Sequence, residues 1–178
     1  MPSQKVTVSV FGSHDCSLEV EQIAHELGKI IAKMDCVLIC GGLLGAMQAV
    51  CRGCKEAGGT TIGLLPGKDK TDANPYVDIA LPTTIGFARN AMVAASADIA
   101  VALPGSYGTE SEICYALVFK RPVIDLGGWK IKGMIPASGI EDAEHRLREL
   151  VDRIRAERAG TTGIAAAAMR IPGAEISA

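Results

Sequence analysis

The sequence predicts an α/β domain of the doubly wound, Rossmann-like kind, in which helices cover both faces of a parallel sheet. Short apolar runs alternate with segments of helical periodicity along the 178 residues, which is typical of a parallel sheet. Hydrophobic residues make up 48% of the chain but aromatic residues only 4%, so the core must consist of Val, Ile, Leu and Ala. No repeat or linker interrupts the pattern, and one domain is expected over residues 1–178.

The first part of the chain alternates between expected strands and helices. In order, these are a strand at 5–11, a helix at 18–34, a strand at 37–40, a helix at 45–57 and a strand at 60–65. The first strand, KVTVSVF, is rich in valine. The first helix repeats apolar side chains at helical spacing, and the second helix is stopped by a pair of glycines.

The second part of the chain opens with a polar surface loop, PGKDKTDANP, at 66–75. The expected elements that follow are a strand at 77–81, a helix at 86–96, a strand at 99–103, a helix at 109–119, a strand at 122–126 and a charged amphipathic helix at 140–158. The last residues, 160–178, are nearly uncharged, and they are treated as a C-terminal tail of undetermined structure.

Charge and composition exclude several classes of protein. The formal net charge of −2 provides no basic surface, so no nucleic-acid partner is expected. No secretory signal is expected, because MPSQKV lacks a charged region followed by an apolar one, and no apolar run reaches the roughly 18–20 residues of a membrane span. We therefore expect a cytoplasmic protein without membrane association. Six dispersed cysteines are expected to be free thiols, and because Cys51 and Cys54 lack a second pair, no metal site is expected.

Three glycine-containing loops, at 12–17, 41–45 and 104–109, are expected at the carboxyl edge of the sheet, where open α/β sheets bind ligands. Glycine lets the backbone approach an anion, and the helix that follows offers free N–H groups and a positive dipole end. The candidate binding residues are Gly12, Ser13, Gly41, Gly42, Gly45, Gly105, Ser106, Tyr107, Gly108 and Thr109. Tight turns alone also explain the glycines, so both interpretations stay open. His14 either contacts a ligand or faces solvent.

Two charged residues, Arg89 and Glu112, are the candidate catalytic residues. Arg89 lies near the start of a helix without other charges, where a guanidinium can bind a phosphate or carboxylate or extend to solvent. Glu112 follows Thr109 by three residues, the spacing of a capping box in which Thr109 caps the helix. The same carboxylate can also act as an acid or base beside a sugar.

Three stretches resemble a known family. ALPGSYGTESEICYAL, at 102–117, resembles the PGGxGTxxE signature of the LOG-like proteins, and CGGLLGAMQAVCRGCKEAGGTTIGLLPG, at 40–67, resembles their second block. ARNAMVAASADIAVALPGSYGTESE, at 88–112, is closer to the branch of the molybdenum cofactor carrier proteins and their bacterial relatives. The resemblance covers about residues 6–126.

The resemblance implies two alternative functions. The carrier-like branch implies binding of a phosphate-bearing nucleotide or molybdopterin-type ligand. If the protein is an enzyme, no cofactor is expected to be required for catalysis. The LOG enzymes imply hydrolysis of the N-glycosidic bond of a nucleoside 5′-monophosphate, rather than lysine decarboxylation. In that case Arg89 and Glu112 occupy the motif's charged positions, and the phosphate loop is formed by Gly105, Ser106, Gly108 and Thr109.

Two departures from the LOG pattern favour the carrier-like function. Ser106 replaces the second glycine of the motif, and Ala88 stands before Arg89 where LOG enzymes usually carry an acidic residue. The resemblance also implies a homodimer or a larger homo-oligomer. The small apolar side chains of the helix at 86–96 support that expectation, because one contact with the sheet cannot bury all of them.

Overall fold

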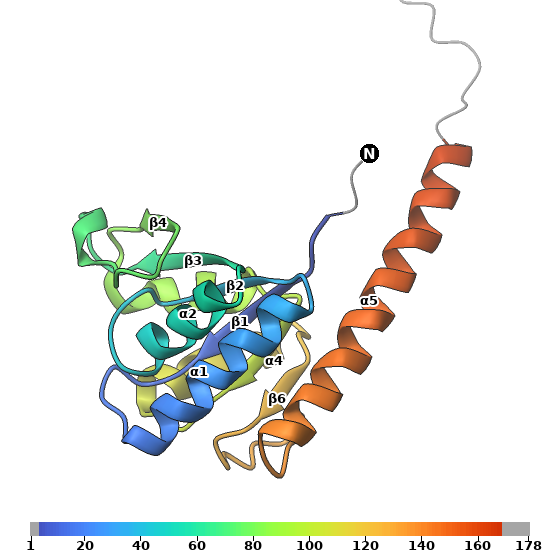
Figure 1. Ribbon diagram of the computed structural model, residues 1–178. Helices are drawn as coiled ribbons and strands as arrows, with labels where there is room; N and C mark the ends of the chain where they lie inside the picture. The colour runs from blue at the N-terminus through green and yellow to red at the C-terminus, as the bar shows by residue number, and fades with distance from the viewer. Residues whose placement is uncertain (1–3, 169–178) are drawn as a thin grey trace, which may run out of the picture.

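Seven parallel strands form the central sheet of the computed structural model, which describes residues 4–168 (Figure 1). The strands are β1 (Thr7–Phe11), β2 (Val37–Cys40), β3 (Thr60–Leu65), β4 (Ile79–Pro82), β5 (Ile99–Ala102), β6 (Val123–Asp125) and β7 (Ile135–Pro136). Their order in the sheet is β4-β3-β2-β1-β5-β6-β7. The chain therefore builds the sheet outward from β1 in one direction and then, from β5, in the other. The predicted fold class is confirmed.

Helices cover both faces of this sheet. The α-helices are α1 (Leu18–Lys33), α2 (Ala46–Glu56), α3 (Asn90–Ala95), α4 (Tyr107–Val118) and α5 (Ile140–Ala168), and the short 3-10 helices are η1 (Lys70–Asp72) and η2 (Gly86–Arg89). Helices α1, α2 and α5 share one hydrophobic core with Val8 and Val10 of β1. Helices α3 and α4 share the other with Phe11. Alternate residues of β1 thus face opposite layers, as the pleat requires.

The differences from the predicted elements have local causes. All six predicted strands are present with ends within two residues of those predicted, but β7 has only two residues and was not predicted. The helix predicted at 86–96 is divided into η2 and α3 at the Arg89–Asn90 step. The last helix continues to Ala168, so the first part of the predicted tail is helical, whereas 169–178 lie outside the described residues. Within the described part of the chain, no helix is long and apolar enough to cross a membrane.

Candidate functional site

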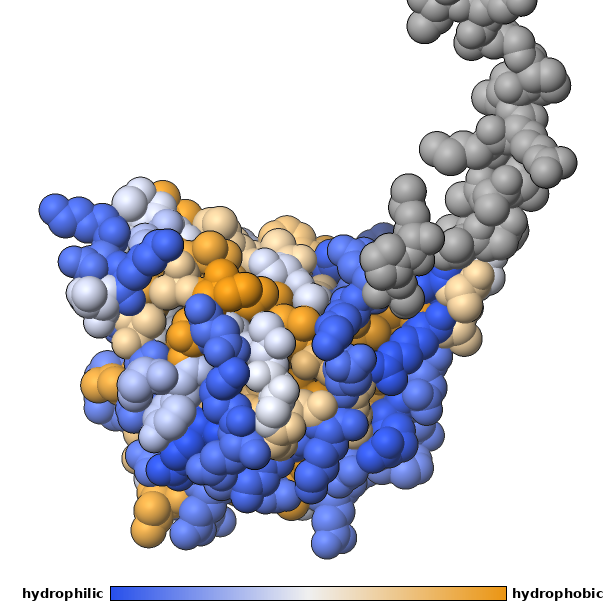
Figure 2. Space-filling model, turned by 45° about the horizontal axis from the view of Figure 1, so that its top comes forward, coloured by the Kyte–Doolittle hydropathy of each residue, from blue (hydrophilic) through white to orange (hydrophobic). Residues whose placement is uncertain are grey.

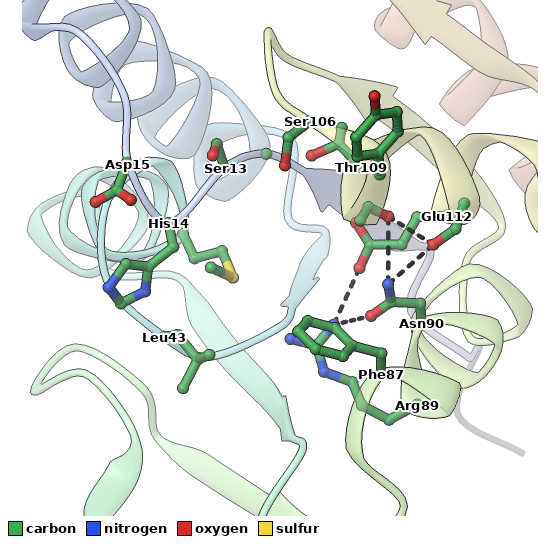
Figure 3. Close-up of a pocket in the computed structure, with 15 residues that line it drawn as sticks. Ser13, His14, Asp15, Leu43, Phe87, Arg89, Asn90, Ser106, Thr109 and Glu112 are labelled. Atoms are coloured by element: carbon green, nitrogen blue, oxygen red, sulfur yellow. Dashed lines mark hydrogen bonds and ion pairs between the residues drawn. The ribbon is translucent and has the colours of Figure 1, made fainter.

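A cavity of about 600 Å³ opens at the carboxyl edge of the sheet (Figure 3). It lies where the strand order reverses between β1 and β5, the position at which open α/β sheets bind ligands. Eight predicted site residues line it: Gly12, Ser13, Arg89, Ser106, Tyr107, Gly108, Thr109 and Glu112. All three predicted loops reach the cavity, the loop at 41–45 through Leu43 alone, and both candidate charged residues line it as well.

The remaining lining residues are His14, Asp15, Leu43, Met47, Phe87, Asn90 and Ser111. His14 is exposed to solvent and also lines the cavity, so its contact with a ligand stays a prediction. Sequence reasoning missed the other six. For Asn90 and Phe87 a signal was available, because they lie next to the predicted Arg89 in the sequence GFARN at 86–90. Leu43, Met47 and Ser111 carry no pattern that separates them from ordinary packing residues.

Four predicted binding residues, Gly41, Gly42, Gly45 and Gly105, do not line the cavity. Two of these glycines leave space for residues that do line the cavity. A Cβ on Gly41 would overlap Nη2 of Arg89, so this glycine leaves room for the guanidinium. A Cβ on Gly105 would overlap the side chain of Thr109. Their lack of a side chain is thus required for packing next to the site.

Arg89 and Glu112 form a buried ion pair across the cavity wall (Figure 3). Nη1 of Arg89 lies 3.2 Å from Oε1 of Glu112, and the two side chains are only 8% and 7% exposed. Nη2 donates to the carbonyl oxygen of Gly41 at 3.4 Å, and Nη1 also donates to Oδ1 of Asn90. Nε is buried and has no acceptor among the described residues. The possibility that Arg89 extends to solvent is therefore wrong.

The predicted capping box of Thr109 and Glu112 is also wrong. Helix α4 begins at Tyr107, and Ser106, in an extended conformation at the N-cap position, makes no side-chain capping hydrogen bond. The helix thus starts two residues before the predicted position, and Glu112 lies in its second turn. From there its carboxylate accepts a hydrogen bond from Arg89 instead of reaching back to the helix start.

The first turn of α4 presents free backbone donors to the cavity. Glu110 is the first residue of this helix whose N–H reaches a carbonyl oxygen, that of Ser106, at 3.0 Å. The N–H groups of Tyr107, Gly108 and Thr109 precede it and have no intrahelical acceptor. All three residues line the cavity. Together with the positive end of the helix dipole, they form the arrangement that binds anions at helix N-termini.

Asn90 holds this turn in place. Its Nδ2 donates to the carbonyl oxygen of Gly108 at 3.2 Å and to Oγ of Ser111 at 2.9 Å. The hydroxyl of Ser111 in turn donates to the same Gly108 carbonyl at 2.7 Å. Since Asn90 is buried and also accepts from Arg89, it connects the ion pair to the helix start. The free donors of α4 are therefore held in a fixed position relative to the guanidinium.

Burial raises the pKa of Glu112 to about 8, although the neighbouring Arg89 favours the charged carboxylate. The desolvation of a carboxylate in this closed position outweighs the attraction of the guanidinium. Near neutral pH, Glu112 is therefore substantially protonated. The protonated carboxyl does not compensate the positive charge of Arg89.

None of the six cysteines lines the cavity. Cys51 and Cys54 are buried in α2, and the Sγ atom of Cys51 lies 3.5 Å from that of Cys40 in the core. Within residues 4–168, no group of three or more His, Cys, Asp and Glu side chains is arranged to hold a metal ion. The chemistry of the cavity therefore depends on its backbone donors, hydroxyls, amide, guanidinium and carboxyl groups.

Residues 5–156 match the model of the SLOG cluster4 family. An uncharacterized protein of Archaeoglobus fulgidus is 41% identical over 119 residues, which are 67% of this chain and 78% of that protein.

Several solved structures share the fold at more than 30% identity, and two of them are molybdenum cofactor proteins from different organisms. The molybdenum cofactor binding protein of Rippkaea orientalis is 31% identical with a TM-score of 0.79, over 83% of this chain and 98% of that one. The molybdenum cofactor carrier protein of Chlamydomonas reinhardtii is 33% identical with a TM-score of 0.77, over 84% and 99%. DNA processing protein A of Helicobacter pylori, at 17% identity and a TM-score of 0.61, shares the fold alone.

Glu112→Gln should change how stability depends on pH. The pKa of Glu112 is about 8 in the folded protein against an ordinary value of 4.5, so the folded state binds the proton more tightly. The free energy of unfolding of the wild type then falls as pH rises between these values. As pH rises from about 5 to 8, urea unfolding should show that the free energy of unfolding of E112Q increases relative to that of wild type, by at most about 1.4 kcal/mol per pH unit.

The matched control is Glu110→Gln, because Glu110 is an exposed glutamate on the same helix and its replacement removes no buried carboxyl. A stability difference between E112Q and wild type that stays constant from about pH 5 to pH 8 would contradict the raised pKa.

Proposed function

The chain belongs to the SLOG cluster4 family of LOG-like proteins, and from this premise we propose that it binds a phosphate-bearing pterin of the molybdenum-cofactor kind. The ligand occupies the cavity at the carboxyl edge of the sheet. The observation that carries the proposal is the first turn of α4, whose three free N–H groups line a cavity that also contains the buried guanidinium of Arg89. The names of the two similar solved structures support the choice of ligand.

The phosphate group is the part of the ligand that these residues suit best. Backbone N–H groups at a helix start bind phosphate without a charged side chain in contact, and Ser13 and Ser106 add hydroxyl donors to the same cavity. Arg89 is already engaged by Glu112, Asn90 and Gly41. It therefore supplies positive potential and holds the wall, while the helix start makes the direct hydrogen bonds.

Gly108→Asp should abolish phosphate binding without unfolding the domain. A Cβ at this position meets nothing closer than Nδ2 of Asn90 at 3.9 Å, and an acidic residue suits the first turn of a helix. The new carboxylate, however, repels an anion at the helix start. Calorimetric titration with AMP or a phosphorylated pterin should show affinity at least about tenfold lower for G108D than for G108N. The asparagine variant has the same shape without the charge, and equal affinities of the two variants would contradict the proposed phosphate position.

A LOG-type phosphoribohydrolase is the second candidate function. One observation favours it: Glu112 lines the cavity with a pKa of about 8, so its protonated form is available near neutral pH to protonate a leaving base. Water would then add to the anomeric carbon as the N-glycosidic bond breaks, releasing ribose 5-phosphate.

Incubation with AMP separates the two functions. The binding function predicts that chromatography detects no free adenine beyond the buffer blank. Release of adenine by the wild type, reduced about 100-fold or more in E112Q, would replace the proposed function with phosphoribohydrolysis.

A homo-oligomer formed through α3 and α4 is part of the same proposal. Apolar side chains interrupt the hydrophilic surface of this protein, as the face in Figure 2 illustrates. On the outer sides of α3 and α4 the exposed apolar residues are Met92, Tyr115, Val118 and, just after α4, Phe119. A helix that is apolar both toward the sheet and away from it is typically buried on both sides. A second copy related by a two-fold axis would provide that burial.

Met92→Glu combined with Tyr115→Glu should convert the oligomer into monomers, because four carboxylates would then meet across a two-fold contact. Light scattering at micromolar concentration should give a dimer or larger species for the wild type and a monomer for the double variant. The control is Leu18→Glu, a more exposed apolar position on α1 in the opposite layer. A monomeric wild type would contradict the proposed assembly.

A further inference from the structure

We propose that the rings of Phe87 and Tyr107 form a stacking subsite for a flat heterocycle at the cavity. This inference rests on the proposed function, because it concerns the same cavity and the same phosphate-bearing ligand. It assigns the part of the ligand that lies beyond the phosphate. It also predicts which class of phosphate compounds the protein distinguishes: those with a planar aromatic ring from those with a sugar alone.

The exposure of the two rings is the first observation. Phe87 is 86% exposed and Tyr107 is 89% exposed, and both line the cavity. The chain contains only three Phe, three Tyr and one Trp, and Phe11, by contrast, is fully buried in the core. Leaving large apolar rings in water forgoes the free energy of burial. Two such rings at one cavity therefore indicate a surface that a ligand covers.

The positions of the rings relative to the phosphate donors are the second observation. Tyr107 is the first residue of α4, so its ring is attached to the same turn whose N–H groups face the cavity. Phe87 lies in η2, two residues before the buried Arg89. Figure 3 shows Phe87 on the wall that carries Arg89 and Asn90, across the cavity from His14 and Leu43. A ligand with its phosphate at the helix start thus has aromatic side chains beside it.

The anchoring of these segments makes the subsite selective. Arg89 and Asn90, two and three residues after Phe87, are buried and hydrogen-bonded. Tyr107 directly precedes Gly108, whose carbonyl oxygen accepts from Asn90. The backbone of each ring is therefore held while the ring itself remains exposed. Aromatic rings on fixed backbone stack on pterins and purines alike, because every such heterocycle has a π face. Ribose 5-phosphate and inorganic phosphate have no face to offer.

The test compares ligands with and without a ring. The probes are AMP and 6-hydroxymethylpterin phosphate, with ribose 5-phosphate and inorganic phosphate as ringless counterparts. Phe87→Ala and Tyr107→Ala should each weaken binding of the ring-bearing probes by about 5- to 150-fold. Binding of the ringless probes should change by less than about twofold. Quenching of the pterin fluorescence on binding should be lost in the same variants. Leu18→Ala, which removes an exposed apolar side chain that neither lines the cavity nor lies on α3 or α4, should change none of these values.

Other outcomes overturn the inference. Equal losses for ringed and ringless probes would assign both residues to the phosphate site, and no loss for either would leave the rings without a role in binding. A change of oligomeric state in F87A or Y107A would assign the rings to a contact between copies. If the wild type binds ribose 5-phosphate as tightly as AMP and the pterin, only the stacking subsite fails. If it binds none of the probes, the proposed function fails with it.

Discussion

The buried contact between Arg89 and Glu112 is the interaction on which the rest of the site depends, because both side chains are almost completely removed from water. A buried guanidinium left without any acceptor typically costs about 3–5 kcal/mol, because its charge is not compensated, whereas Gln at position 112 keeps a side-chain oxygen for Arg89. The pair joins three parts of the chain: the carbonyl that follows β2, the η2–α3 segment and the second turn of α4. The same contacts therefore form the wall of the cavity and stabilise this edge of the sheet.

The electrostatics of the cavity follow from the same constraint. Burial raises the pKa of Glu112, so the carboxyl takes up a proton near neutral pH while Arg89 remains charged. Binding of an anion and protonation of Glu112 then favour each other, because an additional negative charge at the helix start disfavours the carboxylate. Asn90 transmits the position of the pair to the first turn of α4 through Gly108 and Ser111. Charge, backbone donors and helix dipole thus act on one location.

The fold could be predicted from the sequence because parallel strands covered on both faces must be apolar throughout, and runs such as VLIC and IAVAL satisfy that requirement. The two-residue β7 is too short to leave such a signal. At the site, local patterns found the loops and the two charged residues but misassigned some of their roles. Thr109 and Glu112 match the spacing of a capping box, yet a partner 23 residues away binds the carboxylate. Gly41 resembles a ligand-binding glycine, yet it makes room for Arg89. Both roles depend on contacts distant in sequence.

The central claim is that the first turn of α4 binds the phosphate of the ligand. An NMR titration of the ¹⁵N-labelled protein with inorganic phosphate tests it most directly, because each backbone amide reports its own hydrogen bond. The account predicts saturable shifts that are largest at the amides of Tyr107, Gly108 and Thr109. Saturable shifts confined to another surface, such as the basic hollow lined by Lys120, Arg121 and Lys132, would contradict it.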